Sequence, residues 1–134
     1  MDYKEIAKKT VGYLYQAHGS IRNSGIDSLL IALVELRVSQ ISGCAYCCQF
    51  HAGELREMGM PQEVIDQIPG FRHSTDFTAK QRLVLEYAEA VTGLKGNIQL
   101  LTNYFTEREI VELTTSIALM GTLNRLRMIL TDIT

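Results

Sequence analysis

Apolar residues recur every three or four positions along nearly the whole chain, and this spacing constrains its fold more than any other feature. A period of three to four places apolar side chains on one face of an α-helix, whereas strands need alternation, which is weak here. Two capping boxes support helices: Thr78 precedes Gln81, and Thr106 precedes Glu109, each ahead of an apolar-periodic run. The sequence therefore predicts an all-α fold.

The interruptions of this period give the expected elements. We expect helices over residues 2–17, 27–41, 44–59, 61–68, 78–94, 98–105 and 106–130, with loops over 19–25 and 70–77. The second of these helices is apolar around most of its circumference, which is typical of a central helix. The chain of 134 residues has no internal repeat and no linker rich in Pro or Gly. We expect one domain that spans residues 1–134.

The charge balance excludes several classes of partner. The chain has 13 basic and 15 acidic residues, a net charge of −2, which gives no electrostatic footprint for nucleic acid or an anionic membrane. No apolar run approaches the roughly 20 residues that a membrane span needs. The charged start, "MDYKEIAKK", differs from a signal peptide, so we expect a cytoplasmic protein. In a reducing compartment a C-x-x-C pair favours catalysis or metal binding over a structural disulfide.

The segment "CAYCCQFH", residues 44–51, holds all three cysteines and one of the three histidines. Cys44 is expected at the start of a helix, with Cys47 one turn further on and His51 on the same face. Unpaired N–H groups at a helix start stabilise a thiolate, and a nearby histidine can take or give its proton. These residue types at this spacing suit a redox dithiol.

Three alternatives apply to the same segment. The thiols could be inert core residues, since free cysteine is often buried. A zinc site would need four ligands, yet the segment offers one cysteine pair with His51, while His18 and His73 are distant in sequence and follow no ligand pattern. Cys48 could replace Cys47 as the partner of the first cysteine. We favour an arrangement in which Cys48 packs into the core and Cys47 faces a pocket.

Glu35 is the only acidic residue on the second predicted helix beyond its Asp27 cap, and it stands among apolar neighbours in "LVELRV". Two interpretations stay open. Glu35 could form a surface ion pair with Arg37 or Arg22, which would contribute little. It could instead be a partly buried acid that faces the cysteine helix and carries protons.

The segment "ELRVSQISGCAYCCQFH" resembles the signature of the AhpD-like alkylhydroperoxidases, within the carboxymuconolactone decarboxylase family. "FTAKQRLVLEYAEAVTGL" and "YFTEREIVELTTSIALMGTLNRLRMIL" are similar to the later helices of that family, so the resemblance covers residues 2–129. It implies an AhpD-like helical domain of about six or seven helices that assembles as a homo-trimer or homo-hexamer. The decarboxylase branch lacks the cysteine pair, so the match favours the peroxidase branch.

The resemblance also implies a function and its residues. It implies a thiol peroxidase that reduces organic hydroperoxides or hydrogen peroxide without a metal or organic cofactor. The reductant would be an external dithiol, a protein or a small thiol, with lipoyl-type dithiols among the candidates. Cys47 matches the peroxidatic cysteine, Cys44 the resolving cysteine with which it forms a disulfide, and His51 the relay histidine. The usual relay glutamate position is Ala32 here, and Glu35, one helical turn later, is the candidate substitute.

Two further departures concern a pocket. Tyr46 stands where the best-known members have histidine, and Leu123 stands where the family often has tryptophan, which would widen or reshape the pocket. Tyr46, Phe50 and Leu55 could line the pocket entrance, although we favour the core or a subunit interface for them. The rival functions are a disulfide reductase or redox sensor, a lactone-processing, decarboxylating or binding relative, and a zinc-binding helical module.

Overall fold

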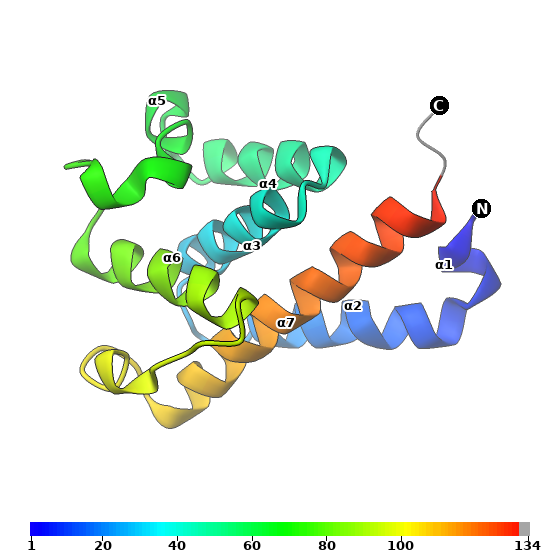
Figure 1. Cartoon of the computed structure of the whole chain (residues 1–134). Coiled ribbons are helices and arrows are strands. Elements are labelled where there is room, and N and C mark those ends of the chain that lie inside the picture. Colours follow the sequence, from blue (N-terminus) through cyan, green and yellow to red (C-terminus); the bar gives the residue numbers. More distant parts are fainter. Residues whose placement is uncertain (132–134) are drawn as a thin grey trace.

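The computed structural model of the chain describes residues 1–131 and confirms the all-α prediction (Figure 1). Within that range the chain forms only helices, seven of them α-helices and two of them 3-10 helices: α1 (Tyr3–Ile6), α2 (Lys8–Arg22), α3 (Ser28–Ser42), α4 (Ala45–Glu57), α5 (Gln62–Ile65), η1 (Ile68–His73), α6 (Ala79–Thr92), η2 (Ile98–Leu100) and α7 (Glu107–Leu130). Both predicted capping boxes form, at the starts of α6 and α7. No helix in the described part of the chain is long and apolar enough to cross a lipid bilayer.

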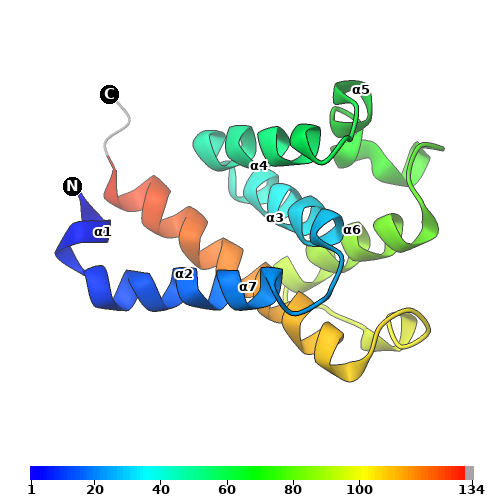
Figure 2. The same ribbon diagram turned by 180° about the vertical axis from the view of Figure 1, so that it is seen from behind.

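Helix α3 lies at the centre of the molecule, packed against α4, α6 and α7 (Figures 1 and 2). Every residue from 30 to 36 is buried, so all sides of this helix face other parts of the chain. The Asp27 side chain caps its start by accepting a hydrogen bond from the backbone N–H of Leu29. The prediction of a central second helix is confirmed, and it makes Glu35 a core residue.

The N-terminal helix differs from the prediction in two ways that matter for the site. The helix is interrupted at Ala7, whose φ of −116° and ψ of 51° are not helical, and this separates α1 from α2. Helix α2 then runs through most of the predicted loop at 19–25 and ends at Arg22. Burial of Ile21 in the core outweighs the glycine and asparagine signals there. The backbone amine of Met1 also donates a hydrogen bond to the carbonyl of Leu130 at 3.0 Å, which holds α1 against the end of α7.

Two shorter elements were also predicted inaccurately. The element expected at 61–68 is a single turn, α5, and Pro69 lies in the first turn of η1 rather than after a helix. Burial of Ile68 and Phe71 explains why the chain stays helical where a loop was expected at 70–77. Of the helix expected at 98–105, only the 3-10 turn Ile98–Leu100 forms.

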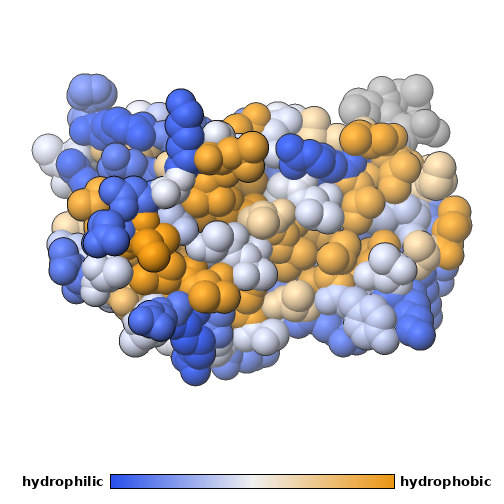
Figure 3. Space-filling model, turned by 60° about the horizontal axis from the view of Figure 1, so that its bottom comes forward, coloured by the Kyte–Doolittle hydropathy of each residue, from blue (hydrophilic) through white to orange (hydrophobic). Residues whose placement is uncertain are grey.

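Apolar residues reach the surface in several separate areas of the face shown in Figure 3, interspersed with hydrophilic ones. Large side chains that are more than half exposed include Ile6, Tyr13, Leu94, Leu100, Val111 and Ile129. Such apolar areas are compatible with contacts between subunits, but they do not identify a subunit interface. The homo-trimer or homo-hexamer therefore stays a prediction.

Candidate functional site

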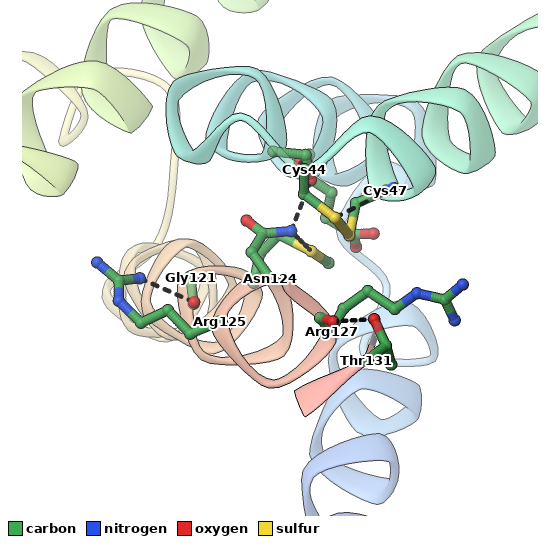
Figure 4. The surroundings of a disulfide bond; sticks show 10 residues. Cys44, Cys47, Gly121, Asn124, Arg125, Arg127 and Thr131 are labelled. Carbon is green, nitrogen blue, oxygen red and sulfur yellow. Dashed lines mark hydrogen bonds between the residues drawn. A yellow bond between two sulfur atoms is a disulfide. The ribbon is translucent and has the colours of Figure 1, made fainter. Parts of the chain in front are cut away.

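The two cysteines of the C-x-x-C pair lie at the corner between α3 and α4 and are joined by a disulfide (Figure 4). Gly43 forms the corner, because its φ of 78° lies in the left-handed region that glycine adopts without strain. Cys44 caps α4, and its Sγ accepts a hydrogen bond from the backbone N–H of Cys47 at 3.3 Å. The structure therefore describes the oxidised form of the dithiol.

The three sulfur atoms have different surroundings. Cys47 lines a cavity, whereas the Cys44 side chain is almost completely buried. Cys48 is half-buried and packs against the core cluster, and burial raises the pKa of its thiol above the ordinary value. This geometry agrees with the expected arrangement, in which Cys47 faces the pocket and Cys48 packs inward.

His51 is buried one turn beyond Cys47 on α4 and lines the same cavity. Its Nδ1 lies 2.8 Å from Oε1 of Glu54 and 3.2 Å from Oε2 of Glu35. Because carboxylates accept, these contacts assign the proton of a neutral His51 to Nδ1. The Nε2 atom is then left to accept a proton from, or return it to, a reacting group.

Glu35 has no exposed surface, which contradicts the surface-pair interpretation. Arg22 is its ion-pair partner, as that interpretation allowed, with Nε and Nη2 donating to its two carboxylate oxygens at 3.2 and 3.1 Å. Arg37 bonds to Glu89 instead. The two-point contact with Arg22 offsets the loss of water around a buried carboxylate. Glu35 is therefore a buried acid beside His51, as the second interpretation expected.

His18 belongs to the same cluster, although the sequence analysis did not predict it there. Its Nε2 lies 3.2 Å from Oε1 of Glu35, and its ring lines the cavity. The hydrogen bond with Glu35 raises the pKa of His18, against the opposing effect of burial. His18 and Arg22 are four residues apart on α2, so both face Glu35, and this spacing was the only available sequence signal.

Glu54 completes the cluster and was also missed. It lies three residues after His51 on α4, accepts from His51, and forms an ion pair with Arg22 at 3.2 Å. Burial alone would raise the pKa of Glu54, but the hydrogen bond with His51 and the charge of Arg22 lower it below its ordinary value. The spacing of three on one helix is the signal that could have identified it.

The cavity beside Cys47 has a volume of about 280 Å³ and is lined by residues of α1, α2, α4 and α7: Tyr3, Lys4, Tyr15, His18, Tyr46, Cys47, Phe50, His51, Met120, Leu123 and Arg127. Tyr46 and Phe50 are about half exposed and line it, so they are not core residues, whereas Leu55 is a core residue. A subunit interface, the other place expected for these residues, stays a prediction. Leu123 lies in the wall, as its comparison with the family tryptophan implied. The arrangement gives a small molecule access to Cys47 and His51.

A metal ion is a poor fit to the same cluster. Glu35, His51 and Glu54 each present one ligand atom, and these atoms lie within 4.8 Å of one another. However, the Arg22 guanidinium bonds to both carboxylates, so a positive charge already occupies the place of a cation. The disulfide leaves Cys44 and Cys47 without the thiolates that zinc would bind. The chemistry of these side chains favours proton transfer over metal binding.

Residues 5–90 match the carboxymuconolactone decarboxylase family, and the chain belongs to this family. Two curated relatives are alkyl hydroperoxide reductases AhpD. The Rhodococcus erythropolis protein is 32% identical over 74 residues, which are 48% of this chain and 41% of that protein. The Nocardia farcinica protein is 44% identical over 45 residues, 34% of this chain and 25% of that protein.

An uncharacterized Bacillus subtilis protein, YdfG, is 26% identical over 92 residues, which cover 69% of this chain. The match spans 63% of YdfG, so this chain covers less than two thirds of these curated relatives. A crystal structure of an Agrobacterium tumefaciens protein of unknown function, described as a candidate antioxidant defence protein AhpD, superposes with a TM-score of 0.88. It is 27% identical and covers 96% of this chain, which in turn covers 92% of it. Together these likenesses make the chain an AhpD-like member of the family.

Proposed function

We propose that this protein is a thiol-dependent hydroperoxide reductase that uses the Cys44–Cys47 dithiol to reduce organic hydroperoxides or hydrogen peroxide. The observation that carries the proposal is the position of Cys47. It is disulfide-bonded to Cys44 at a helix start, and it shares a small cavity with His51, whose Nδ1 contacts a buried carboxylate. The likeness to the two AhpD proteins gives further support.

The first step oxidises Cys47 and reduces the peroxide. The Cys47 thiolate attacks the terminal oxygen of the hydroperoxide, so an S–O bond forms as the O–O bond breaks. The terminal OH passes to sulfur, which becomes a sulfenic acid. The departing oxygen takes a proton from His51 and leaves as an alcohol, or as water when the substrate is hydrogen peroxide.

The second step closes the disulfide. Cys44 attacks the sulfenic sulfur of Cys47, the S–S bond forms and the S–O bond breaks. The hydroxide combines with the thiol proton and leaves as water. The product is the disulfide bond seen between these two residues.

An external dithiol then restores the enzyme. Its thiolate attacks Cys47, the sulfur that lines the cavity, and Cys44 leaves as a thiolate. The N–H of Cys47 already points at the Cys44 sulfur, so the start of α4 stabilises this leaving group. The second thiol of the reductant releases Cys47 and becomes oxidised to a disulfide. The cycle consumes one dithiol per peroxide and needs no metal or organic cofactor.

The surrounding charged residues position His51. Glu35 and Glu54 both contact its Nδ1 and hold the ring so that Nε2 is left to exchange the proton. Arg22 holds both carboxylates in place, and His18 also contacts the Glu35 carboxylate. We assign Cys47, Cys44 and His51 as catalytic residues and Glu35, in place of an acid at Ala32, as the buried acid of the relay.

The setting of the reaction is part of the proposal. The reductant would be a dithiol protein, with a lipoyl-type dithiol among the candidates, or a small thiol, and the cytoplasm would supply it. We further propose a homo-trimer or homo-hexamer, in line with the exposed apolar side chains on the surface.

Peroxide titration of the reduced protein tests the function. Intact mass should show the loss of one pair of hydrogens per chain, and peptide mapping should assign the disulfide to Cys44 and Cys47. Cys47→Ser should abolish turnover with dithiothreitol and cumene hydroperoxide. Cys48→Ser, which changes a neighbouring thiol that packs against the core, is the matched control and should retain turnover. Full turnover by Cys47→Ser would overturn the assignment.

A disulfide reductase or redox sensor is the second candidate. The observation that favours it is the hydrogen bond to the Cys44 sulfur, which assists disulfide exchange whether or not a peroxide is the oxidant. Rates of oxidation of the reduced protein by a small disulfide and by cumene hydroperoxide separate the two. Exchange that greatly exceeds peroxide oxidation would support the second candidate.

A further inference from the structure

We propose that the cavity beside Cys47 selects hydroperoxides that carry a carboxylate at the end opposite the peroxide, with Lys4 and Arg127 binding that carboxylate. The inference rests on the proposed peroxidase function and names the substrate class for the same site. A reactive cysteine with a proton donor accounts for recognition of the peroxide group only, at one end of the substrate. The two cations in the wall have no part in that chemistry.

Both cations lie against aromatic rings of the cavity wall. The Arg127 guanidinium, near the end of α7, is 3.8 Å from the centre of the Tyr46 ring. The Lys4 amine, on α1, is 5.1 Å from the centre of the Tyr15 ring. All four of these residues line the cavity. The aromatic faces hold the two charges beside the cavity, where Lys4 stays exposed and Arg127 is half-buried.

The electrostatics of the wall are one-sided. Among the described residues, the cavity lining contains Lys4, Arg127 and two histidines but no acidic side chain. The ion pairs formed within residues 1–131 involve other cations, so neither Lys4 nor Arg127 is neutralised by a described carboxylate. The chain as a whole carries a net charge of −2, so a positive wall is not a general property of its surface. Such a wall attracts an anionic ligand.

The remaining lining defines the body of that ligand. Phe50, Met120 and Leu123 contribute apolar surface. The volume of about 280 Å³ is near the lower end of the range, roughly 300 Å³ upward, found for ligand pockets. The site therefore suits one aromatic ring or a short aliphatic chain. A neutral alkyl hydroperoxide of this size would leave both cations without a ligand, whereas a hydroperoxy acid would bind one or both.

Matched substrates test the inference. Cumene hydroperoxide with a carboxylate in the para position, and its methyl ester, differ in charge at one end only, and dithiothreitol supplies an uncharged reductant. We expect kcat/KM to be about tenfold higher for the acid than for the ester at low ionic strength. Added salt should reduce this ratio, because Lys4 and Arg127 are both partly accessible to solvent.

Variants assign the effect to the two cations. Lys4→Met and Arg127→Met keep most of each apolar stem, and together they should bring the acid-to-ester ratio close to one. Lys80→Met is the matched control, since Lys80 lies 5.2 Å from the centre of the Phe105 ring and is not in the cavity lining. It should leave the ratio at the wild-type value. A wild-type ratio near one, or a ratio that survives the double substitution, would overturn the inference.

A binding measurement separates this inference from the peroxidase function itself. The ligand is para-isopropylbenzoate, which has no peroxide group and cannot react with the oxidised protein. The methyl ester of para-isopropylbenzoate is the neutral control. Calorimetry should show the acid binding about tenfold more tightly than the ester, with the difference lost in the double variant. If neither peroxide is turned over, the proposed function fails and the binding result still decides whether the carboxylate subsite exists. Equal binding of acid and ester would overturn it.

Discussion

Nδ1 of His51 lies 3.2 Å from Oε2 of Glu35, a side chain with no exposed surface. The two residues come from different helices that meet at the corner formed by Gly43. One carboxylate thus links the cavity that contains Cys47 to the ion-paired interior beneath it.

Glu35→Gln should harm both stability and turnover, because it removes a negative charge and leaves Arg22 with fewer partners in a buried site. Breaking a buried ion pair typically costs about 3–5 kcal/mol, and we expect a loss of about 3 kcal/mol, since glutamine keeps some of the hydrogen bonds. The peroxidase rate should fall about a hundredfold, the usual scale for a lost acid–base contribution. Urea unfolding and dithiothreitol-coupled turnover measure the two effects.

Glu89→Gln is the matched control for that substitution. Glu89 also pairs with two arginines, Arg37 and Arg72, but its side chain is 20% exposed and it is not part of the cavity lining. We expect a loss of about 1 kcal/mol and unchanged turnover. Equal loss of activity in both variants would mean that Glu35 acts only through stability.

His18 should make stability fall as the pH rises above its ordinary pKa of 6.5. The hydrogen bond with Glu35 raises the pKa of His18 above its ordinary value of 6.5, so folding favours the protonated ring. This contribution is complete below the unfolded-state value and is lost as the pH rises through the folded-state pKa. The difference in unfolding free energy between wild type and His18→Gln should therefore shrink as the pH rises from below 6.5.

Urea denaturation at a series of pH values measures this difference. His73→Gln, which changes an exposed histidine in η1, is the control and should give a constant difference. A His18→Gln difference that stays constant or grows with pH would contradict the prediction.

Local sequence signals accounted for much of the fold. The two capping boxes and the Asp27 cap depend on neighbouring residues only, and they form where they were predicted. The break at Ala7 and the continuation of α2 to Arg22 depend on packing against distant helices, such as burial of Ile21. No short window of sequence contains that information.

The residues of the site also divide into those that local spacing predicted and those that only the packing of helices brings together. Cys44, Cys47 and His51 occupy one turn of helix after another, so their proximity could be read from spacing. Glu35 needed the α3–α4 corner as well, which explains why two interpretations stayed open. His18 and Arg22 approach Glu35 only because α2 is longer than expected and packs beside α3 at that level. Lys4 enters the cavity wall through the fold of α1 against α7.

Cys48 should be a slow thiol in the oxidised protein. It is the only cysteine outside the disulfide, and burial raises its pKa, so little thiolate is present near neutral pH. We expect iodoacetamide to label it about tenfold more slowly than the same residue in urea-unfolded protein at pH 8. Mass spectrometry of timed samples measures the rate, and Cys48→Ser should show no labelling. Equal rates in folded and unfolded protein would contradict the burial of this thiol.

Leu123→Trp should discriminate between large and small peroxides, because Leu123 lies in the cavity wall and the larger ring would fill part of its 280 Å³. We expect kcat/KM for cumene hydroperoxide to fall about tenfold, which corresponds to roughly 1.4 kcal/mol of lost transition-state binding. The value for hydrogen peroxide should change by less than about twofold, since this substrate needs little space.

Ile129→Trp provides the control for this substitution, since Ile129 is on the same helix, is 74% exposed and is absent from the cavity lining. Its kinetics should match wild type with both peroxides. Circular dichroism and thermal unfolding identify any general damage to the fold from the larger side chain. Such damage would lower kcat/KM for both peroxides together. A selective loss of kcat/KM with cumene hydroperoxide in Leu123→Trp would show that the cavity wall formed by α7 limits substrate size. An equal loss with both peroxides in a folded Leu123→Trp protein would place the productive binding mode elsewhere.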